Sequence, residues 1–293
     1  RYPQHGEPAA QLWTLGSYER SEGVTRFSAE IGTTAPRGRV AKKVTIIEGH
    51  PVVYTEHTLE GFAARTPLGH HAILAADPDA PLSISTSPIR FGTIADAPKE
   101  AYANGAYSAL QPATDFHTLS KVPTRWNDPP TTDCTTFPSR CGFTDLLAVF
   151  QEPRLDRSPS WVAAVNAKQR YVWFSLKDPE ILPSTLFWMD YYGRHTPPWR
   201  GRNCCIGLED VCSYLANGLA DSAAPNRVNK RGVPTSMELR PEAATTVRYI
   251  QGAVGTPEDI TRVESVRVED GAAKFQSEEG ATVRDPRRGE DRY

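Results

Sequence analysis

The sequence predicts an all-β fold built from many short antiparallel strands. Its 25 prolines and 21 glycines are spread along the 293 residues, which argues against long helices because both residue types interrupt regular structure. Short runs rich in valine, isoleucine, threonine and aromatic residues lie between these breakers, as expected for strands joined by turns. With 39% apolar and 23% charged residues, the chain has enough apolar material for a sizeable core.

The first expected element is a β-hairpin, with strands at 44–47 and 52–60 around the turn at 48–51. Other strands are predicted at 67–74, 82–85, 161–165, 171–176, 204–209 and 260–268. A further strand pair is expected from 236–239 and 245–250.

One short helix is predicted at 210–219, where Val211, Tyr214 and Leu215 supply apolar positions. Residues 96–138 are expected to form long loops over the sheet. We expect a single domain over 1–283 and a charged tail over 284–293.

Composition disfavours several classes of partner. The net charge is −2, so no basic excess is available to neutralise the phosphates of nucleic acid or of an anionic membrane. No apolar run approaches the roughly 20 residues that span a bilayer. The chain opens without a methionine or an apolar signal segment, so no secretory signal is visible, although a processed or truncated N-terminus could have removed one. A cytoplasmic protein is expected, which agrees with the cysteine content. The five cysteines include the neighbours Cys204 and Cys205, which fits reduced thiols better than disulfides or a zinc site.

The most informative residue is Glu209, which follows the apolar run Cys205-Ile206-Gly207-Leu208. A carboxylate is rarely buried unless it is paired or functional. The alternative is a carboxylate at a helix start that stabilises free backbone amides.

Two histidine sites precede this glutamate. His5 stands before a glycine that allows a sharp turn, although an exposed histidine near a mobile terminus is the simpler interpretation. His70 and His71 are neighbours on a predicted strand, so one of them at most points into a given cleft. Packing is the alternative role for this pair. Together, histidine and glutamate can supply general acid/base chemistry near neutral pH.

The segment 191–203 combines tyrosine, tryptophan and arginine, and it includes Trp199 and Arg202. Such groups stack on sugar faces and donate hydrogen bonds to hydroxyl or phosphate oxygens. The alternative is a surface loop held by arginine–carboxylate pairs. Four other tryptophans are expected in the core, at 126, 161, 173 and 188. The motifs of serine hydrolases, P-loops, dinucleotide-binding folds and zinc metalloproteases are missing from the sequence.

Four motifs in this order resemble the aldose 1-epimerase (galactose mutarotase) family. They are His5-Gly6-Glu7 with Trp13, Gly69-His70-His71-Ala72-Ile73-Leu74, Cys205-Ile206-Gly207-Leu208-Glu209-Asp210, and Leu239-Arg240-Pro241-Glu242. The resemblance covers roughly residues 1–255. It implies an antiparallel β-supersandwich with a sugar-binding face. In that family a run of strands precedes the His-Gly motif, and here those strands are expected to be missing, cleaved or replaced.

The resemblance also implies a function, the cofactor-independent interconversion of sugar anomers. Glu209 would be the base that deprotonates the anomeric hydroxyl, and His71 the acid that protonates the ring oxygen. The residues expected to contact the substrate are His5, His70, Asp145, Trp199 and Arg202. Asp145 is our assignment for the family's mid-chain aspartate. The arginines of 191–203 favour a sugar phosphate or an acidic sugar. A binding-only carbohydrate module and a polysaccharide lyase or hydrolase are the alternatives.

Overall fold

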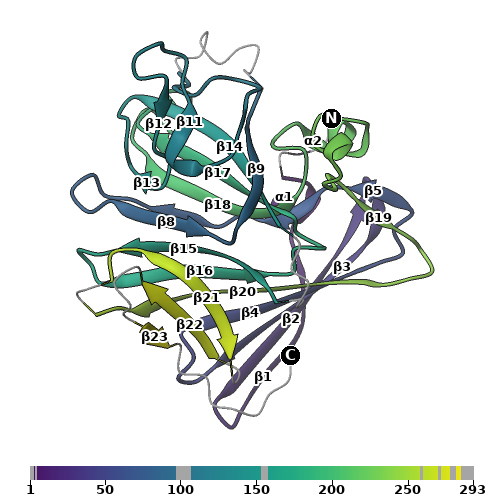
Figure 1. The fold of residues 1–293 in the computed structure, drawn as a ribbon. Helices are drawn as coiled ribbons and strands as arrows, with labels where there is room; N and C mark the ends of the chain where they lie inside the picture. Colours follow the sequence, from purple (N-terminus) through teal and green to yellow (C-terminus); the bar gives the residue numbers. More distant parts are fainter. Residues whose placement is uncertain are drawn as a thin grey trace.

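The computed structural model describes residue 3, residues 5–96, 107–152, 158–257, 260–269 and 272–277, and the backbone of 282–284. The expected all-β fold is confirmed, and two large antiparallel sheets dominate it (Figure 1). The predicted tail residues 285–293 lie outside the described part.

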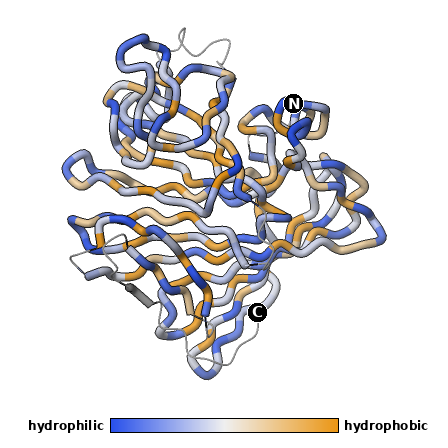
Figure 2. Tube along the Cα trace, viewed as in Figure 1, coloured by the Kyte–Doolittle hydropathy of each residue, from blue (hydrophilic) through white to orange (hydrophobic). Residues whose placement is uncertain are grey.

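The nine-stranded sheet contains the long N-terminal strands. Its order is β1 (Thr14–Ser21), β2 (Val24–Thr34), β3 (Arg37–Ile47), β4 (Val52–Glu60), β20 (Thr245–Gly255), β16 (Tyr171–Lys177), β15 (Ser160–Asn166), β8 (Leu82–Thr86) and β13 (Thr136–Phe137). Hydrophobic and hydrophilic residues are interspersed along the long strands β1–β4 (Figure 2), whereas β15 is buried along its whole length because both of its faces are covered.

The seven-stranded sheet carries the late glutamate. Its strands are β10 (Asp115–Phe116), β9 (Ile89–Ile94), β14 (Phe143–Gln151), β17 (Ser184–Tyr191), β18 (Cys204–Cys212) and β6 (Leu68–His70), with β7 (Ile73–Ala75) also paired to β18. Strand β18 therefore has β17 on one side and both β6 and β7 on the other.

Smaller elements complete the fold. The short pairs are β11 (Val122–Pro123) with β12 (Thr131–Thr132), and β5 (Ala64–Thr66) with β19 (Met237–Leu239). A C-terminal sheet consists of β21 (Val263–Glu269), β22 (Ala272–Ser277) and β23 (Thr282–Arg284). The helices are α1 (Glu7–Ala10), η1 (Leu119–Lys121), α2 (Gly218–Ala223) and η2 (Asn229–Arg231).

The main core lies between the two large sheets. Ile84, Val162 and Ala164 come from the nine-stranded sheet, and Leu147 and Leu208 from the seven-stranded sheet; all five side chains are fully buried. A second apolar cluster joins the nine-stranded sheet to the C-terminal sheet through residues such as Phe174 and Phe275, whose ring centroids are 4.7 Å apart.

A buried polar network also connects the two large sheets. The carboxylate of Asp210 on β18 accepts hydrogen bonds from Lys177 Nζ (2.5 Å), Ser175 Oγ (2.6 Å), Thr185 Oγ1 (2.6 Å) and Tyr249 OH (3.1 Å). Lys177, Ser175 and Tyr249 belong to the nine-stranded sheet, so this carboxylate points into the interface between the sheets.

Several predicted elements are confirmed and three are corrected. The hairpin at 44–60 is present as β3 and β4, and the strands at 82–85, 161–165 and 171–176 are present as β8, β15 and β16. The helix predicted at 210–219 is wrong, because β18 continues to Cys212 and α2 begins at Gly218. Every residue from Ile206 to Cys212 is buried, so both faces of the strand are covered, and this keeps the segment extended where its local pattern also fits a helix turn.

The strand predicted at 67–74 is split into β6 and β7 at His71 and Ala72. The predicted pairing of 236–239 with 245–250 is also wrong. β19 pairs with β5, while β20 lies between β4 and β16 in the nine-stranded sheet. Turn residues between two strands do not determine which partners each strand finds in three dimensions.

All five cysteines are free thiols. Across the described ranges, no cluster of three or more histidine, cysteine, aspartate or glutamate side chains has the geometry of a metal site. Within the same ranges, the helices are too short or too polar to cross a membrane.

Candidate active site

Glu209 lies inside strand β18, so it is not a helix-start carboxylate. Successive side chains of a strand face opposite sides, which puts Glu209 on the same face as Gly207 and puts Asp210 on the interface side. A Cβ atom at Gly207 would lie 2.6 Å from Glu209 Oε1, so the glycine leaves the space that the carboxylate occupies. The Glu209 side chain is 11% exposed, and this burial raises its pKa to about 7.

His71 is brought to Glu209 by the interruption between β6 and β7. Both short strands pair with β18, with His70 opposite Asp210 and Ile73 opposite Gly207. The residue between them is therefore placed beside Glu209, and His71 Nε2 lies 3.3 Å from Glu209 Oε1. The His71 side chain is 40% exposed, so solvent reaches the pair from this edge. Burial, with a smaller contribution from nearby His5, lowers the pKa of His71.

His5 joins this pair from a distant part of the chain. Its ring packs edge-on against His71, with 4.6 Å between the ring centroids and an interplanar angle of 84°. The backbone at His5 and at Gly6 has positive φ, 61° and 77°, which matches the sharp turn expected at this glycine. Three residues that are far apart in sequence, His5, His71 and Glu209, thus form one cluster.

This cluster has the composition of an acid/base pair. Glu209 and His71 are close enough to share a proton, and the pKa of the acid is raised towards that of an imidazole while the pKa of the imidazole is lowered. Such a pair holds one exchangeable proton near neutral pH and can accept at one atom while it donates at the other. Proton transfer to and from hydroxyl and ether oxygens is the chemistry that this arrangement can perform.

His70 lies on the opposite side of the strand from this cluster. Its ring stacks on Tyr249, with 3.9 Å between centroids and an interplanar angle of 8°, and lies 5.1 Å from the ring of His57. Burial lowers the pKa of His70 to about 4, so the ring is neutral at pH 7. This placement gives His70 a packing role between the sheets in place of the expected contact with substrate.

Asp145 is also turned away from Glu209. It lies opposite Met189, which lies opposite Ile206, so it faces the core side of the sheet. Its Oδ1 accepts hydrogen bonds from Ser108 Oγ (2.6 Å) and from the backbone amides of Ala109 (2.9 Å) and Leu110 (3.0 Å). The Asp145 carboxylate therefore anchors the segment 108–110. This geometry does not support the contact with substrate that the sequence predicted for Asp145.

Trp188 is a residue of this face that the sequence placed in the core. It lies directly opposite Gly207 in the register of β17 and β18, and it is half-buried. Trp161 and Trp173, by contrast, are buried as expected. The two-residue period of a strand could have predicted this position. Phe187 and Met189 point into the core, so Trp188 between them faces the opposite side of the sheet.

The aromatic and cationic loop continues from Trp188. The guanidinium of Arg194 lies 5.9 Å from the Trp188 ring centroid and 3.8 Å from that of Trp199. Trp199 is therefore connected to the Glu209 face through Arg194. Arg202 is exposed, and its backbone amide donates to the Trp199 carbonyl oxygen over 3.2 Å.

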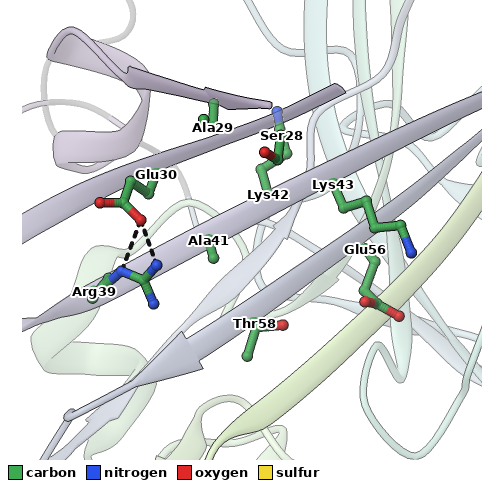
Figure 3. Close-up of a pocket in the computed structure, with 10 residues that line it drawn as sticks. Ser28, Ala29, Glu30, Arg39, Ala41, Lys42, Lys43, Glu56 and Thr58 are labelled. Carbon is green, nitrogen blue, oxygen red and sulfur yellow. Dashed lines mark hydrogen bonds and ion pairs between the residues drawn. The ribbon is translucent and has the colours of Figure 1, made fainter. Parts of the chain in front are cut away.

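A separate hollow of about 150 Å³ lies on the nine-stranded sheet, and none of the predicted site residues lines it (Figure 3). Its charged side chains are largely paired with one another, since Arg39 binds both Glu30 and Glu60. Glu56 in the same hollow binds Arg248 at 2.9 Å. Paired surface charges of this kind have little reason to be reactive, so the Glu209 cluster remains the better candidate site.

Comparison with known proteins supports the fold. No family model and no curated protein sequence matches the chain. A protein of Synechocystis sp. PCC 6803 superposes with a TM-score of 0.53 at 10% identity, over 88% of this chain and 70% of that one. A candidate aldose 1-epimerase of Escherichia coli gives a TM-score of 0.51 at 12% identity, over 86% of this chain and 71% of that one.

A galactose mutarotase related enzyme of Lactobacillus acidophilus gives a TM-score of 0.50 at 11% identity, over 88% of this chain and 76% of that one. At these identities the likeness concerns the fold, and function has to be argued from the site. The chain has the antiparallel β-sandwich fold of the galactose mutarotase-like proteins.

Proposed function

We propose that this protein is an aldose 1-epimerase-like isomerase that interconverts the anomers of a sugar. The observation that carries the proposal is the 3.3 Å approach of His71 to a buried Glu209 whose pKa is about 7. Among solved structures with this fold are a candidate aldose 1-epimerase and a galactose mutarotase related enzyme, which agrees with the proposed chemistry.

The reaction needs one base and one acid, and it moves protons alone. The Glu209 carboxylate takes the proton of the anomeric hydroxyl, and the protonated His71 donates to the ring oxygen as the bond from that oxygen to the anomeric carbon breaks. The open aldehyde turns about its bond to the neighbouring carbon. On reclosure at the other face, His71 takes back the proton of the ring-oxygen hydroxyl and Glu209 gives its proton to the new anomeric oxygen, so the pair ends in its starting state. His5 orients the sugar from the side of His71.

Burial acts on both groups of the pair, because it raises the pKa of Glu209 to about 7 and lowers the pKa of His71. With one proton on the pair, burial therefore favours the neutral state, in which Glu209 holds the proton, over the carboxylate–imidazolium state that starts the cycle. The proton has to pass from Glu209 to His71 before the ring opens, and the 3.3 Å between Glu209 Oε1 and His71 Nε2 is a suitable distance for that transfer.

We further propose that the sugar carries an acidic group or a phosphate. Arg194 is held against two tryptophan rings beside the Glu209 face, and its charge counteracts the burial that raises the pKa of Asp190. A guanidinium fixed in this way is a suitable contact for phosphate or carboxylate oxygens.

A glycoside hydrolase is less well supported. Such enzymes use two carboxyl groups about 5–9.5 Å apart. Asp145 faces the core, and Asp190 lies opposite Cys205, four residues before Glu209 along β18. Four residues of a strand span about 13 Å, which exceeds this separation.

The test is the exchange of anomers measured by NMR magnetisation transfer with galactose, glucose and glucose 6-phosphate. The Glu209→Gln variant is expected to lose about 10²–10⁴-fold in rate, the usual effect of removing a general base. Glu56→Gln makes the same chemical change on the nine-stranded sheet and should leave the rate unaltered.

Three outcomes would argue against the epimerase function, and a fourth would argue against the acidic or phosphorylated sugar. If the wild-type rate does not exceed that of Glu209→Gln for any of the three sugars, the epimerase function is wrong. Sugar binding that survives Glu209→Gln without any exchange would identify a binding module. Release of reducing ends or unsaturated products from polysaccharide would identify a hydrolase or a lyase. Equal rates and affinities for glucose and its 6-phosphate would remove the role given to Arg194.

A further inference from the structure

Glu7 is a buried carboxylate that is bound entirely by hydrogen-bond donors. Its Oε2 accepts from the backbone amides of Thr34 (2.7 Å) and Ala35 (3.0 Å). Its Oε1 accepts from Thr34 Oγ1 (2.6 Å) and Gln11 Nε2 (3.0 Å). The residue is 7% exposed, and these four hydrogen bonds satisfy the carboxylate within the described part of the chain.

These donors belong to a fixed part of the nine-stranded sheet. Thr34 is the last residue of β2, and the following turn into β3 is closed by a hydrogen bond from Thr33 Oγ1 to the Pro36 carbonyl oxygen (2.6 Å). β2 and β3 are paired along eleven residues, from Val24 with Ile47 to Thr34 with Arg37. The tip that holds Glu7 is therefore anchored to one of the longest strand pairs in the molecule.

The residue two positions earlier touches the other sheet. His5 packs against His71, which stands between the two short strands that pair with β18. Residues 5–7 therefore bridge the tip of the nine-stranded sheet and the candidate active site on the seven-stranded sheet. Gly6, with φ 77°, forms the turn between the two contacts.

The anchor at Glu7 is strongest with a carboxylate. The backbone amides of Thr34 and Ala35 can only donate, and both meet Oε2. Glutamine would keep these two bonds but lose the negative charge that strengthens them, and the Thr34 hydroxyl and the Gln11 amide would have to change from donor to acceptor at the other atom. These hydrogen bonds, led by the one from the Thr34 side chain, lower the pKa of Glu7 to about 2. The carboxylate is thus ionised wherever the epimerase chemistry would operate.

We infer that Glu7 is a positioning residue, whose four hydrogen bonds to the β2–β3 tip hold His5 in edge-on contact with His71. The inference rests on the proposed function for the role of His5 in turnover, but the contact itself can be measured without activity. Glu7 acts through His5 and does not touch the substrate.

The first measurement is the ionisation of His71 followed by NMR titration. The chain has seven histidines, so the His71 signal is assigned by its loss in His71→Asn. His71 faces Glu209 and His5, and nearby His5 lowers the pKa of His71. Replacing His5 by asparagine should raise that pKa, and Glu7→Gln should raise it in the same way, because His5 then leaves His71.

The second measurement is a double-mutant cycle on the rate of anomer exchange. His5→Asn and Glu7→Gln are each expected to lower the rate by about 10- to 100-fold, as for a group misplaced by about 1 Å. The double variant should be no slower than the slower single variant, because both changes remove the same contact. Glu7→Asp, which keeps the charge but shortens the reach, should restore part of the rate.

Two controls separate positioning from general stability. Val165→Ala opens a core site near the C-terminal sheet and is expected to destabilise the fold without moving the His71 pKa. Glu56→Gln repeats the acid-to-amide change on an exposed pair. The inference is wrong if Glu7→Gln leaves the His71 pKa at its wild-type value, or if the two losses of rate multiply. If the wild type exchanges no anomers, the proposed function fails while the titration still decides the role of Glu7.

Discussion

At the scale of single residues, the central feature is the carboxyl group of Glu209, which titrates near neutral pH because its pKa is about 7. Glu209 is buried beside His71, and the desolvation that raises its pKa to about 7 makes it a usable base at neutral pH. The same burial opposes its ionised form, so a residue suited to catalysis is a source of instability when it is charged.

Glu209→Gln is therefore expected to stabilise the protein at alkaline pH. The folded-state pKa lies above the ordinary value of 4.5, so the favourable contribution of the protonated acid is complete below about pH 4.5 and is lost as the pH rises through 7. Glutamine stays neutral, so the variant should exceed the wild type in unfolding free energy at pH 8–9 by about 1–3 kcal/mol, and by less at pH 5. Urea unfolding at both pH values measures this, and an equal difference at both would contradict it.

At the scale of elements, β18 uses its two faces for different tasks. Gly207 and Glu209 lie on the face that carries His71 and Trp188, while Asp210 turns into the interface between the sheets. The break between β6 and β7 is equally important, because an unbroken strand would not leave His71 free to approach Glu209. The site is a product of strand register and of one interruption.

Gly207→Ala is predicted to affect activity more than stability. The new Cβ would lie 2.6 Å from Glu209 Oε1 and 3.1 Å from Ile73 Cδ1, so the end of the glutamate side chain must move away from His71. We expect a loss of about 10- to 100-fold in the rate of anomer exchange and a change in unfolding free energy within about 1 kcal/mol.

Gly32→Ala on β2 is the matched control for this variant. A Cβ there meets nothing within 4 Å, so neither activity nor stability should change appreciably. Full activity of Gly207→Ala would show that the position of the Glu209 carboxylate is not critical.

At the scale of the whole molecule, the two large sheets are joined by an apolar core that contains the buried ion pair of Lys177 and Asp210. Lys177 and Asp210 have fully buried side chains, and Lys177 Nζ also donates to Ser184 O (2.7 Å) and Thr185 Oγ1 (2.8 Å). Burial lowers the pKa of Lys177, and the carboxylate of Asp210 counteracts this effect. Such a pair adds little net stability over apolar residues but is costly to break.

Lys177→Met is predicted to destabilise the fold by about 3–5 kcal/mol, because it leaves Asp210 charged and buried without its cation. A second change, Asp210→Asn, should recover part of this loss, since it removes the unpaired charge. Chemical unfolding of the single and double variants measures both effects. A double variant that is less stable than Lys177→Met would show that the hydrogen bonds of Asp210 matter more than its charge.

The sequence by itself determined the fold class and the strand positions with strong local patterns. The frequency of glycine and proline argued against long helices. The apolar, β-branched runs of β3–β4, β15 and β16 predicted strands, and the structure has strands there. The sequence also identified His5, His71 and Glu209 as candidates, because each has a titratable side chain in a distinctive local motif that can be recognised without the tertiary structure. The proximity of these three residues is a geometric finding, and their catalytic roles stay predictions.

Tertiary structure decided the features that depend on partners across the chain. Whether Asp210–Cys212 is strand or helix, which strands pair with β19 and β20, and which face His70 and Asp145 adopt all follow from sheet register, which local sequence does not encode. The anchoring of Glu7 on the β2–β3 tip belongs to the same class, since its donors lie 27 and 28 residues away. Sequence supplies the reactive groups, and long-range packing decides which of them meet.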